Sequence, residues 1–213
     1  MKKLFIFDFD GVLVDTVLDS VKAFNHVLSE YDKPTYSEDV TNFRHEDFWE
    51  FIKLNVYDFK EEFYRRFLEV YEESELENTQ AYDGMIDVLT NLKKQDKTLA
   101  ICSNREEPEL HFLCDKFLKE VDFKYISGYR KGVPSKPDPY RLNEIIEKVN
   151  IPKEEVIYFG DRIVDIEAAK NAGIDMILVT YGQGNKEDYS NPYPLVLIDS
   201  PSEIINIMKK GII

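Results

Sequence analysis

The stretch that decides the fold is residues 2–16, KKLFIFDFDGVLVDT. An apolar run from Leu4 to Phe7 ends at two acidic residues, Asp8 and Asp10, and Gly11 follows directly. Aspartate is uncommon in strands, and a buried carboxylate is costly unless a partner neutralises it. The pattern therefore predicts a buried strand that delivers a pair of carboxylates to a functional site.

The spacing of the two carboxylates indicates what that site holds. Residues two apart in an extended chain point to the same side, so Asp8 and Asp10 are expected to project together from the carboxyl end of the strand. Ligands bind at this end of the strands in open α/β sheets, and Gly11 allows a sharp exit without a Cβ atom. Two like charges this close raise each other's pKa unless a cation lies between them.

The composition limits the class of protein. With 213 residues the chain can bury a sizeable core, as one domain or as a main domain with a smaller insert. Its hydrophobic fraction of 43% and charged fraction of 32% are typical of a soluble globular protein. The net charge of -14 disfavours a nucleic-acid partner, because a phosphate backbone would be repelled.

The sequence also predicts the surroundings of the protein. No apolar run reaches the ~18 residues of a membrane-spanning helix, and the first run meets Asp8 too early for a signal peptide. Cys102 and Cys114 lie in no spacing typical of metal or redox sites. We expect a reduced, cytoplasmic protein with no membrane partner, either a monomer or a small homo-oligomer.

Short apolar runs alternate with segments of helical spacing, which predicts an α/β fold. The expected strands are the runs at 3–7, 98–103, 155–160 and 175–180, with weaker runs at 123–127 and 195–198. We expect a Rossmann-like core, in which a mainly parallel sheet carries helices on both faces.

Residues 15–83 break this alternation and predict an inserted, all-helical cap domain. The insert has no glycine before Gly84, and residues 36–80 hold 11 of the 28 aromatic residues. Phe59, Phe63, Phe67 and Val70 form one stripe at helical spacing, which is typical of a helix–helix core. The α/β core domain would then comprise residues 1–14 and 84–213.

Further carboxylates follow a later strand. Asp161 stands at the end of the run 155–160, and Asp165 shares a helix face with it if a helix begins near Arg162. Carboxylates that converge at one sheet edge form an oxygen-rich site for a hard cation, and Mg²⁺ fits because it takes few carboxylates plus substrate phosphate.

Two more motifs offer groups for a phosphoryl group. The run 101–104, ICSN, ends a strand with Ser103 and Asn104, whose side chains can hydrogen-bond phosphoryl oxygens. Lys136 lies in the proline-rich loop SKPDP at 135–139, where its ammonium group can neutralise a phosphoryl group and a carboxylate.

The motifs at 8–16, 101–104, 135–139 and 160–173 occur in the order and approximate spacing of the four motifs of the haloacid dehalogenase (HAD) superfamily. The sequence resembles this family over essentially its whole length, because the helical insert lies where the family has its helical cap. In pattern it is most similar to phosphoglycolate phosphatases, β-phosphoglucomutases and other phosphatases of small metabolites.

The resemblance implies roles for individual residues. Asp8 would be the nucleophile that forms an aspartyl-phosphate, and it would also bind Mg²⁺. Asp10 would act as the general acid and base, with its backbone carbonyl on the metal. Ser103 and Lys136 would bind the phosphoryl group. The metal would also be held by Asp161, with Asp165 as a further ligand or as an anchor behind the ligands.

Some positions stay open. Asn104 and Arg105 would either contact substrate or cap the following helix. Arg162 stands where the family usually has serine or threonine, and it would add charge near the phosphate or point to solvent. In the insert, Arg44 is a better candidate than His45 to contact a second anionic group on the substrate. The alternative is that these residues belong to a solvated helix end.

The main hypothesis is a Mg²⁺-dependent phosphatase that acts on a small phosphorylated metabolite. Because Asp10 and Asp161 are present, phosphoryl transfer is favoured over dehalogenation. One alternative is a phosphomutase of the β-phosphoglucomutase type. Another is a non-catalytic protein that binds a phosphorylated ligand or regulates a partner on the same fold. A phosphorylated receiver domain fits less well, since it needs no helical insert.

Overall fold

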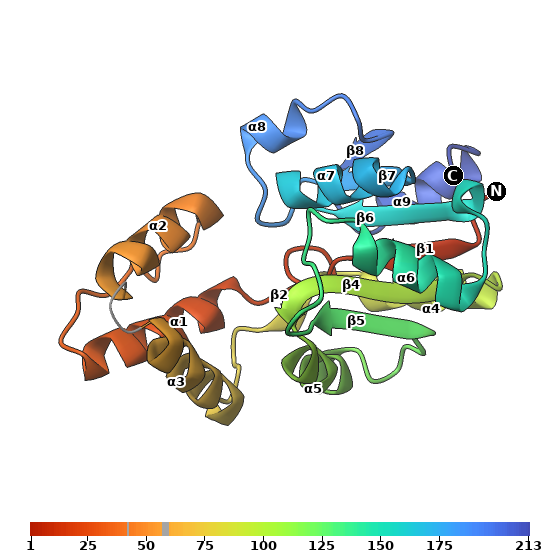
Figure 1. Ribbon diagram of the computed structural model, residues 1–213. Helices are drawn as coiled ribbons and strands as arrows, with labels where there is room; N and C mark the ends of the chain where they lie inside the picture. Colours follow the sequence, from red (N-terminus) through yellow and green to blue (C-terminus); the bar gives the residue numbers. More distant parts are fainter. Residues whose placement is uncertain (42, 57–59) are drawn as a thin grey trace. The chain divides into compact units, whose positions relative to one another are not determined.

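A computed structural model describes residues 1–41, 43–56 and 60–213 of the chain (Figure 1). The chain divides into two compact units. Met1–Val14 and Ala81–Ile213 form one, here called the α/β unit, and Asp15–Gln80 form the other, the helical unit. The second boundary therefore lies between Gln80 and Ala81, whereas the sequence analysis placed it between Asp83 and Gly84.

A six-stranded sheet forms the centre of the α/β unit, and its strands follow the order β5-β4-β1-β6-β7-β8. All neighbouring strands pair in parallel. The strands are β1 (Leu4–Phe7), β4 (Thr98–Glu106), β5 (Tyr125–Tyr129), β6 (Val156–Gly160), β7 (Asp175–Val179) and β8 (Val196–Ile198). The first strand of the chain thus lies inside the sheet, flanked by β4 and β6.

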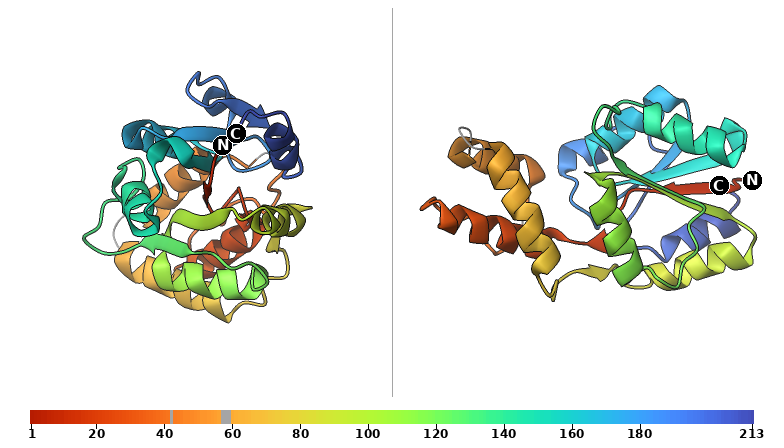
Figure 2. Two further views of the ribbon diagram at one scale, coloured as in Figure 1. Left: turned by 90° about the vertical axis from the view of Figure 1, so that its right-hand side faces the viewer. Right: turned by 60° about the horizontal axis from the view of Figure 1, so that its bottom comes forward.

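Helices cover both faces of this sheet. They are α4 (Met85–Lys94), α5 (Glu107–Phe117), α6 (Tyr140–Val149), α7 (Ile163–Ala172), α8 (Lys186–Tyr189) and α9 (Glu203–Lys209), with a 3-10 turn, η2, at Lys153–Glu155. Figure 2 (left) shows α6 and α7 on one face, with α4 and α9 on the other. The predicted fold class, a mainly parallel α/β core with an all-helical insert, is confirmed.

The apolar runs of the sequence form the core because every strand inside a parallel sheet is buried on both faces. All four residues of β1 are fully buried. Leu4 and Ile6 join the core under α6 and α7, and Phe7 stacks on Phe159 with ring centroids 4.7 Å apart. All six predicted strands are present. Strand β4 runs further than predicted, to Glu106, with a register shift between Cys102 and Glu106.

The helical unit packs around aromatic side chains. Its helices are α1 (Val17–Glu30), α2 (His45–Val56) and α3 (Lys60–Glu73). Phe24 of α1 stacks on Phe67 of α3 at a centroid distance of 4.0 Å and meets Phe48 of α2 edge-on at 5.0 Å. Phe63 and Phe67 are buried as the predicted stripe requires; Phe59, a third member of that stripe, lies outside the described residues.

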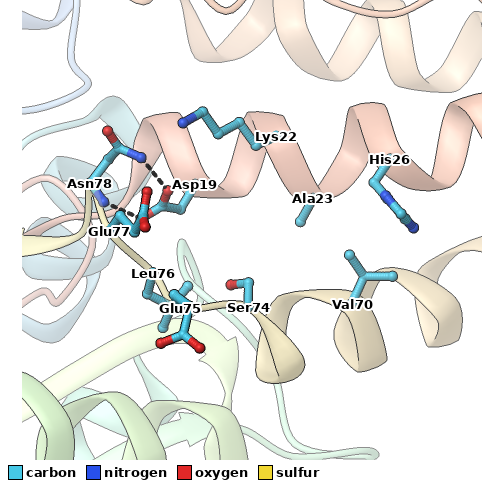
Figure 3. A pocket seen from close by; sticks show the side chains of 10 residues that line it. All are labelled: Asp19, Lys22, Ala23, His26, Val70, Ser74, Glu75, Leu76, Glu77 and Asn78. Carbon is cyan, nitrogen blue, oxygen red and sulfur yellow. Dashed lines mark hydrogen bonds between the residues drawn. The ribbon is translucent and has the colours of Figure 1, made fainter.

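The return segment of the helical unit is fastened to α1 through Asp19, whose carboxylate is buried. Figure 3 shows this carboxylate facing Asn78 beside a groove of about 290 Å³. Asp19 accepts hydrogen bonds from the backbone N–H of Asn78 (2.9 Å), from its amide Nδ2 (2.7 Å) and from the Thr79 hydroxyl (2.8 Å). Two short strands, β2 (Val14–Asp15) and β3 (Gln80–Ala81), pair where the unit begins and ends.

None of the helices that the structure describes combines the length and apolar character needed to span a membrane. Both cysteines are unpaired and buried. Burial raises the pKa of the Cys102 thiol to about 11 and that of the Cys114 thiol to about 12. Because the thiolate is the reactive form, both side chains are inert parts of the core.

We therefore expect both thiols of the folded protein to react with a disulfide reagent at pH 8 at least ~100-fold more slowly than in guanidinium chloride. The measurement is the rate at which the reagent releases its coloured thiolate under the two conditions. The unfolded chain is the control, because it shows that the reagent reacts with both cysteines once they are exposed. Rapid modification of either thiol in the native protein would contradict the burial described here.

Candidate active site

Three neighbouring strands bring the predicted site residues together. Asp8 follows β1, Ser103 lies in β4, and Asp161 follows β6, and these strands are adjacent in the sheet. Since all three run in the same direction, their carboxyl ends meet at one edge. Lys136 reaches the same place from the loop before α6, and Asp165 from the first turn of α7.

The Lys136 ammonium group joins two carboxylates at this edge. Its Nζ lies 2.9 Å from Asp8 Oδ2 and 2.7 Å from Asp165 Oδ1, and only 2% of its side chain is exposed. Burial lowers the pKa of Lys136, but the charges of Asp165 and Asp8 together raise it by more, so the net pKa lies above the usual lysine value. The side chain is therefore a permanent cation in the site.

Burial raises the pKa of both neighbouring carboxylates, but their partners make the net shifts opposite. Burial raises the pKa of Asp8 to about 6, although attraction by Lys136 opposes the shift. For Asp165 burial also acts upward, but Lys136 and the Tyr158 hydroxyl lower its pKa below the usual value. Asp165 is thus a fixed anion, whereas Asp8 is the carboxylate that protonates first as the pH falls below neutral.

Asp165 uses both of its oxygens in hydrogen bonds to protein. Oδ1 accepts from Lys136 Nζ and from the Tyr158 hydroxyl, each at 2.7 Å. Oδ2 accepts from the backbone N–H groups of Asp161 (3.2 Å) and Arg162 (3.1 Å). A carboxylate has about four acceptor positions, and all are used here. Of the two alternatives for Asp165, the geometry favours the anchor over the metal ligand.

Asp161 has the opposite arrangement. Its side chain is fully buried. Oδ2 accepts a hydrogen bond of 2.6 Å from the backbone N–H of Gln183, while Oδ1 is buried with no partner among the described residues. Burial, together with Asp165 and Asp8, raises the pKa of Asp161 well above the usual value. An unpaired buried carboxylate oxygen is a costly feature that a bound cation would relieve.

The carboxylates have the spacing of a metal site. Among the described residues, Asp8, Asp161 and Asp165 each offer one oxygen, and these atoms lie within 4.8 Å of one another. A set of hard oxygen donors with one open carboxylate oxygen suits Mg²⁺. The site therefore fits the divalent cation that the sequence predicts.

A glycine-containing loop after β7 encloses Asp161, and sequence reasoning missed it. A Cβ atom on Gly184 would lie 2.0 Å from the Asp161 carbonyl oxygen, and one on Gly182 would lie 2.6 Å from Asp161 Oδ2. Gly11, with a positive φ of 79°, would place a Cβ 2.1 Å from the same Oδ2. The available signal was the sequence YGQG directly after the run 175–180, at the sheet edge where the other motifs end.

Asp10 is held by Arg105. The guanidinium Nη2 lies 2.6 Å from Asp10 Oδ1, and Nε lies 3.0 Å from Oδ2. Arg105 also pairs with the buried carboxylate of Glu109. Only 22% of the Asp10 side chain is exposed. Neither alternative weighed for Arg105, substrate contact or helix capping, anticipated this ion pair with Asp10.

Asn104 has a role that the sequence did not indicate. Its Oδ1 accepts from the backbone N–H of Lys136 (3.0 Å), and its Nδ2 donates to the Lys136 carbonyl (3.1 Å). The helix α5 begins later, at Glu107, so Asn104 does not cap it. Asn104 instead fixes the loop that carries Lys136.

Tyr158 is a further side chain that the sequence analysis did not assign to the site. Its hydroxyl accepts from Lys136 Nζ at 3.0 Å and donates to Asp165. Tyr158 pairs with Ile6 in the register of β1 and β6, so its side chain points to the face covered by α6 and α7. The available signal in the sequence was the hydroxyl of this tyrosine inside the otherwise apolar run 156–159.

The remaining predicted residues are Arg44, His45 and Arg162. Arg44 belongs to the helical unit, directly before α2, where its carbonyl accepts the Phe48 N–H. Its side chain is 54% exposed and lies 3.5 Å from Asp47. His45 is the first residue of α2. Arg162 immediately precedes α7 and donates its backbone N–H to Asp165.

A family model described as haloacid dehalogenase-like hydrolase matches residues 5–179. A phosphoglycolate phosphatase of Agrobacterium fabrum is 31% identical over 191 residues, covering 85% of this chain and 82% of the relative.

Solved structures agree in fold. A Haemophilus somnus structure provisionally assigned as a phosphoglycolate phosphatase has a TM-score of 0.82 at 23% identity, covering 97% of this chain and 98% of the other. A Thermotoga maritima structure provisionally assigned as a β-phosphoglucomutase has a TM-score of 0.77 at 26% identity, covering 99% of each chain.

These comparisons confirm the predicted superfamily and the predicted enzyme class, a phosphatase. The family model alone covers far more than half of the chain. The chain therefore belongs to the family of haloacid dehalogenase-like hydrolases.

Proposed function

We propose that the protein is a Mg²⁺-dependent phosphatase that hydrolyses the phosphate monoester of a small metabolite through an aspartyl-phosphate on Asp8. The observation that carries the proposal is the buried Asp8 carboxylate, which lies 2.9 Å from the Lys136 ammonium group at the carboxyl end of β1. The open oxygen of Asp161 beside it supports the metal requirement. Relatives named phosphoglycolate phosphatase support a small, anionic phosphate ester as substrate.

The reaction follows from these positions in two steps. In the first, an Asp8 oxygen attacks phosphorus and forms an acyl phosphate, while Asp10 gives a proton to the departing alcohol oxygen. In the second, Asp10 takes a proton from water, which attacks phosphorus, releases orthophosphate and restores the Asp8 carboxylate. Phosphoryl transfer needs positioning and charge stabilisation above all. The Lys136 ammonium and the Ser103 hydroxyl are suited to hold the phosphoryl oxygens.

The cation would be held by Asp8, the open Oδ1 of Asp161 and the backbone carbonyl of Asp10. When bound, Mg²⁺ neutralises charge on the phosphoryl oxygens. Asp165 orients Lys136 and the start of α7 from behind. Arg105, through its hydrogen bonds to both oxygens of Asp10, fixes the direction of the proton-transferring carboxylate.

The helical unit is proposed to act as a cap that selects the leaving group. The exposed guanidinium of Arg44, which pairs only loosely with Asp47 at 3.5 Å, is the proposed contact for a second anionic group on the substrate. The two free, buried thiols are consistent with a reducing compartment, and the cytoplasm is the proposed location.

A phosphomutase is the second candidate, and the similarity to the Thermotoga maritima structure favours keeping it. Both reactions share the aspartyl-phosphate, so only the acceptor of the phosphoryl group differs. Product analysis separates them. Stoichiometric release of orthophosphate supports the phosphatase, whereas isomerisation of a sugar phosphate with little orthophosphate supports the mutase.

Replacing Asp8 by asparagine tests the main proposal. We expect Asp8→Asn to lower turnover of phosphate esters by at least ~10³-fold, because the nucleophile is lost. The measurement is orthophosphate release across a panel of phosphate esters with Mg²⁺ and with a chelator, which should silence the wild type. Asp175→Asn is the matched control, since Asp175 is a carboxylate of the same sheet that pairs with Lys2 at 2.6 Å. Turnover that survives in Asp8→Asn would exclude Asp8 as nucleophile.

The glycine loop gives a prediction for metal affinity. In Gly184→Ala the new methyl group would meet the Asp161 carbonyl oxygen at 2.0 Å, so Asp161 must shift. We expect the Kd for Mg²⁺, measured by calorimetry without substrate, to rise ~10-fold to ~100-fold. Gly211→Ala is the control, because Gly211 follows α9 and a Cβ there meets no atom within 4 Å, so that only the backbone strain of its positive φ of 69° is introduced. An unchanged Kd in Gly184→Ala would contradict the assignment of Asp161 to the metal.

The proposed role of Arg44 predicts a selective effect. For esters whose leaving group carries a second anionic group, Arg44→Ala should raise KM by about 10-fold, since one charge-assisted hydrogen bond is lost. For esters without such a group, KM should stay near the wild-type value. Arg65→Ala removes another exposed arginine of the helical unit and serves as the control. Equal changes in KM for both classes of ester would rule out the role.

A further inference from the structure

We propose that Arg141 is a positioning residue that locks the Ser103 strand end and the Lys136 loop into one rigid holder for the phosphoryl group. The proposal rests on the proposed function and adds to it a residue that none of the four motifs contains. Arg141 lies in the first turn of α6, and only 1% of its surface is exposed.

The guanidinium group makes three hydrogen bonds, each to a residue of a phosphoryl-binding segment or its flank. Nη1 donates to the carbonyl oxygen of Ser103, and Nη2 donates to Oδ1 of Asn104. Nε donates to the carbonyl oxygen of Pro134, two residues before Lys136, at 3.2 Å. One planar group therefore joins two segments that are about thirty residues apart in the sequence.

The connection continues from Asn104 to Lys136. The same Oδ1 that accepts from Arg141 also accepts from the Lys136 backbone N–H at 3.0 Å, and Asn104 Nδ2 donates to the Lys136 carbonyl at 3.1 Å. Asn104 is thus clamped between the arginine and the lysine loop. A continuous series of hydrogen bonds thus runs from Arg141 through Asn104 to the backbone of Lys136, whose side chain is the proposed phosphoryl-binding cation.

The acceptors are unusual for a buried arginine because all three are neutral. Among the residues that the structure describes, no carboxylate lies within ion-pair distance of Arg141. Burying an unneutralised charge is costly, and hydrogen bonds to a cation offset only part of that cost. A bound dianionic phosphoryl group near Ser103 and Lys136 would complete the compensation, since charges interact strongly where water is excluded.

Precision of placement explains why such a residue affects the reaction. Ser103 and Lys136 hold the same phosphoryl group from different segments, so their relative positions decide whether it aligns with Asp8. A misplacement of ~1 Å can cost ~100-fold in rate. Lysine at position 141 would keep the charge but lose the forked geometry that reaches all three acceptors.

The experiment compares Arg141→Lys and Arg141→Met with the wild type by two readouts. The first is kcat/KM for the best phosphate ester, and the second is the Kd of orthophosphate in the presence of Mg²⁺, measured by calorimetry. We expect a loss of ~10-fold to ~100-fold in kcat/KM in both variants, together with a weaker affinity for orthophosphate. Arg130→Met is the matched control. Arg130 pairs with Glu144, which lies on α6 like Arg141, but Arg130 takes no part in the hydrogen bonds that lead from Arg141 to Lys136. The substitution should lower Tm while leaving both readouts near the wild type.

A double-mutant cycle separates positioning from general destabilisation. If Arg141 acts through Asn104, then Arg141→Lys should cost much less in an Asn104→Ala background than in the wild type. Asn104→Ala alone also tests the chain should both Arg141 variants fail to fold, and it is expected to weaken orthophosphate binding as well. Additive effects, or an orthophosphate affinity that Arg141→Lys and Asn104→Ala leave unchanged, would overturn the proposal.

The two proposals fail in different ways. If the wild type hydrolyses no phosphate ester, the proposed function falls, but weaker orthophosphate binding by Arg141→Lys would still support the positioning role. If the wild type hydrolyses esters and Arg141→Lys matches it in kcat/KM and Kd, only the role of Arg141 is refuted. A wild type that hydrolyses no ester and also binds no orthophosphate would refute both.

Discussion

The structure of the α/β unit depends on one buried ion triplet, in which the Lys136 ammonium bridges Asp8 and Asp165. A buried charge survives only with a partner, and here one cation stands against three carboxylates once Asp161 is included. Four hydrogen bonds to Asp165 offset part of this imbalance. The open oxygen of Asp161 leaves a position where a cation would offset the rest. A site with surplus negative charge would attract a divalent cation, and under the proposed function this cation and Lys136 would together accept an anionic phosphoryl group.

The surrounding elements are arranged to support that triplet. Helix α7 begins where Asp165 accepts two backbone N–H groups, so the residue that orients Lys136 also fixes the first turn of the helix. Strand β6 adds the Tyr158 hydroxyl between the lysine and the carboxylate. The same contacts that hold the sheet to its helices thus define the site, which explains why the polar groups can be buried without loss of order.

Much of the fold and part of the site could be predicted from the sequence, because their signals are local. Each strand of the parallel sheet is an apolar run, and the paired carboxylates Asp8 and Asp10 follow the first run directly. The prediction did not extend to Gly184, Tyr158 or Arg141. Their contacts depend on which segments meet in space. Gly184 leaves room for Asp161 because it lacks a Cβ atom, Tyr158 places its hydroxyl on the α6 side of the sheet, and the Arg141 guanidinium lies between two loops. Likewise Arg105 was assigned to substrate or to a helix cap, since nothing in its neighbours shows that Asp10 lies opposite.

The pairing of β2 with β3 has a consequence for how such an enzyme changes over evolutionary time. The chain enters and leaves the helical unit on two strands that are hydrogen-bonded side by side, and Asp19 ties the last residues of the unit back to its first helix. The inserted segment therefore begins and ends at one place, and the entropic cost of holding its two ends together rises only slowly with its length. An insertion with joined ends can be lengthened, shortened or replaced without moving β1 and the carboxylates that follow it. The segment between β2 and β3 can then change in length and sequence while the sheet and its cluster of carboxylates are inherited unchanged.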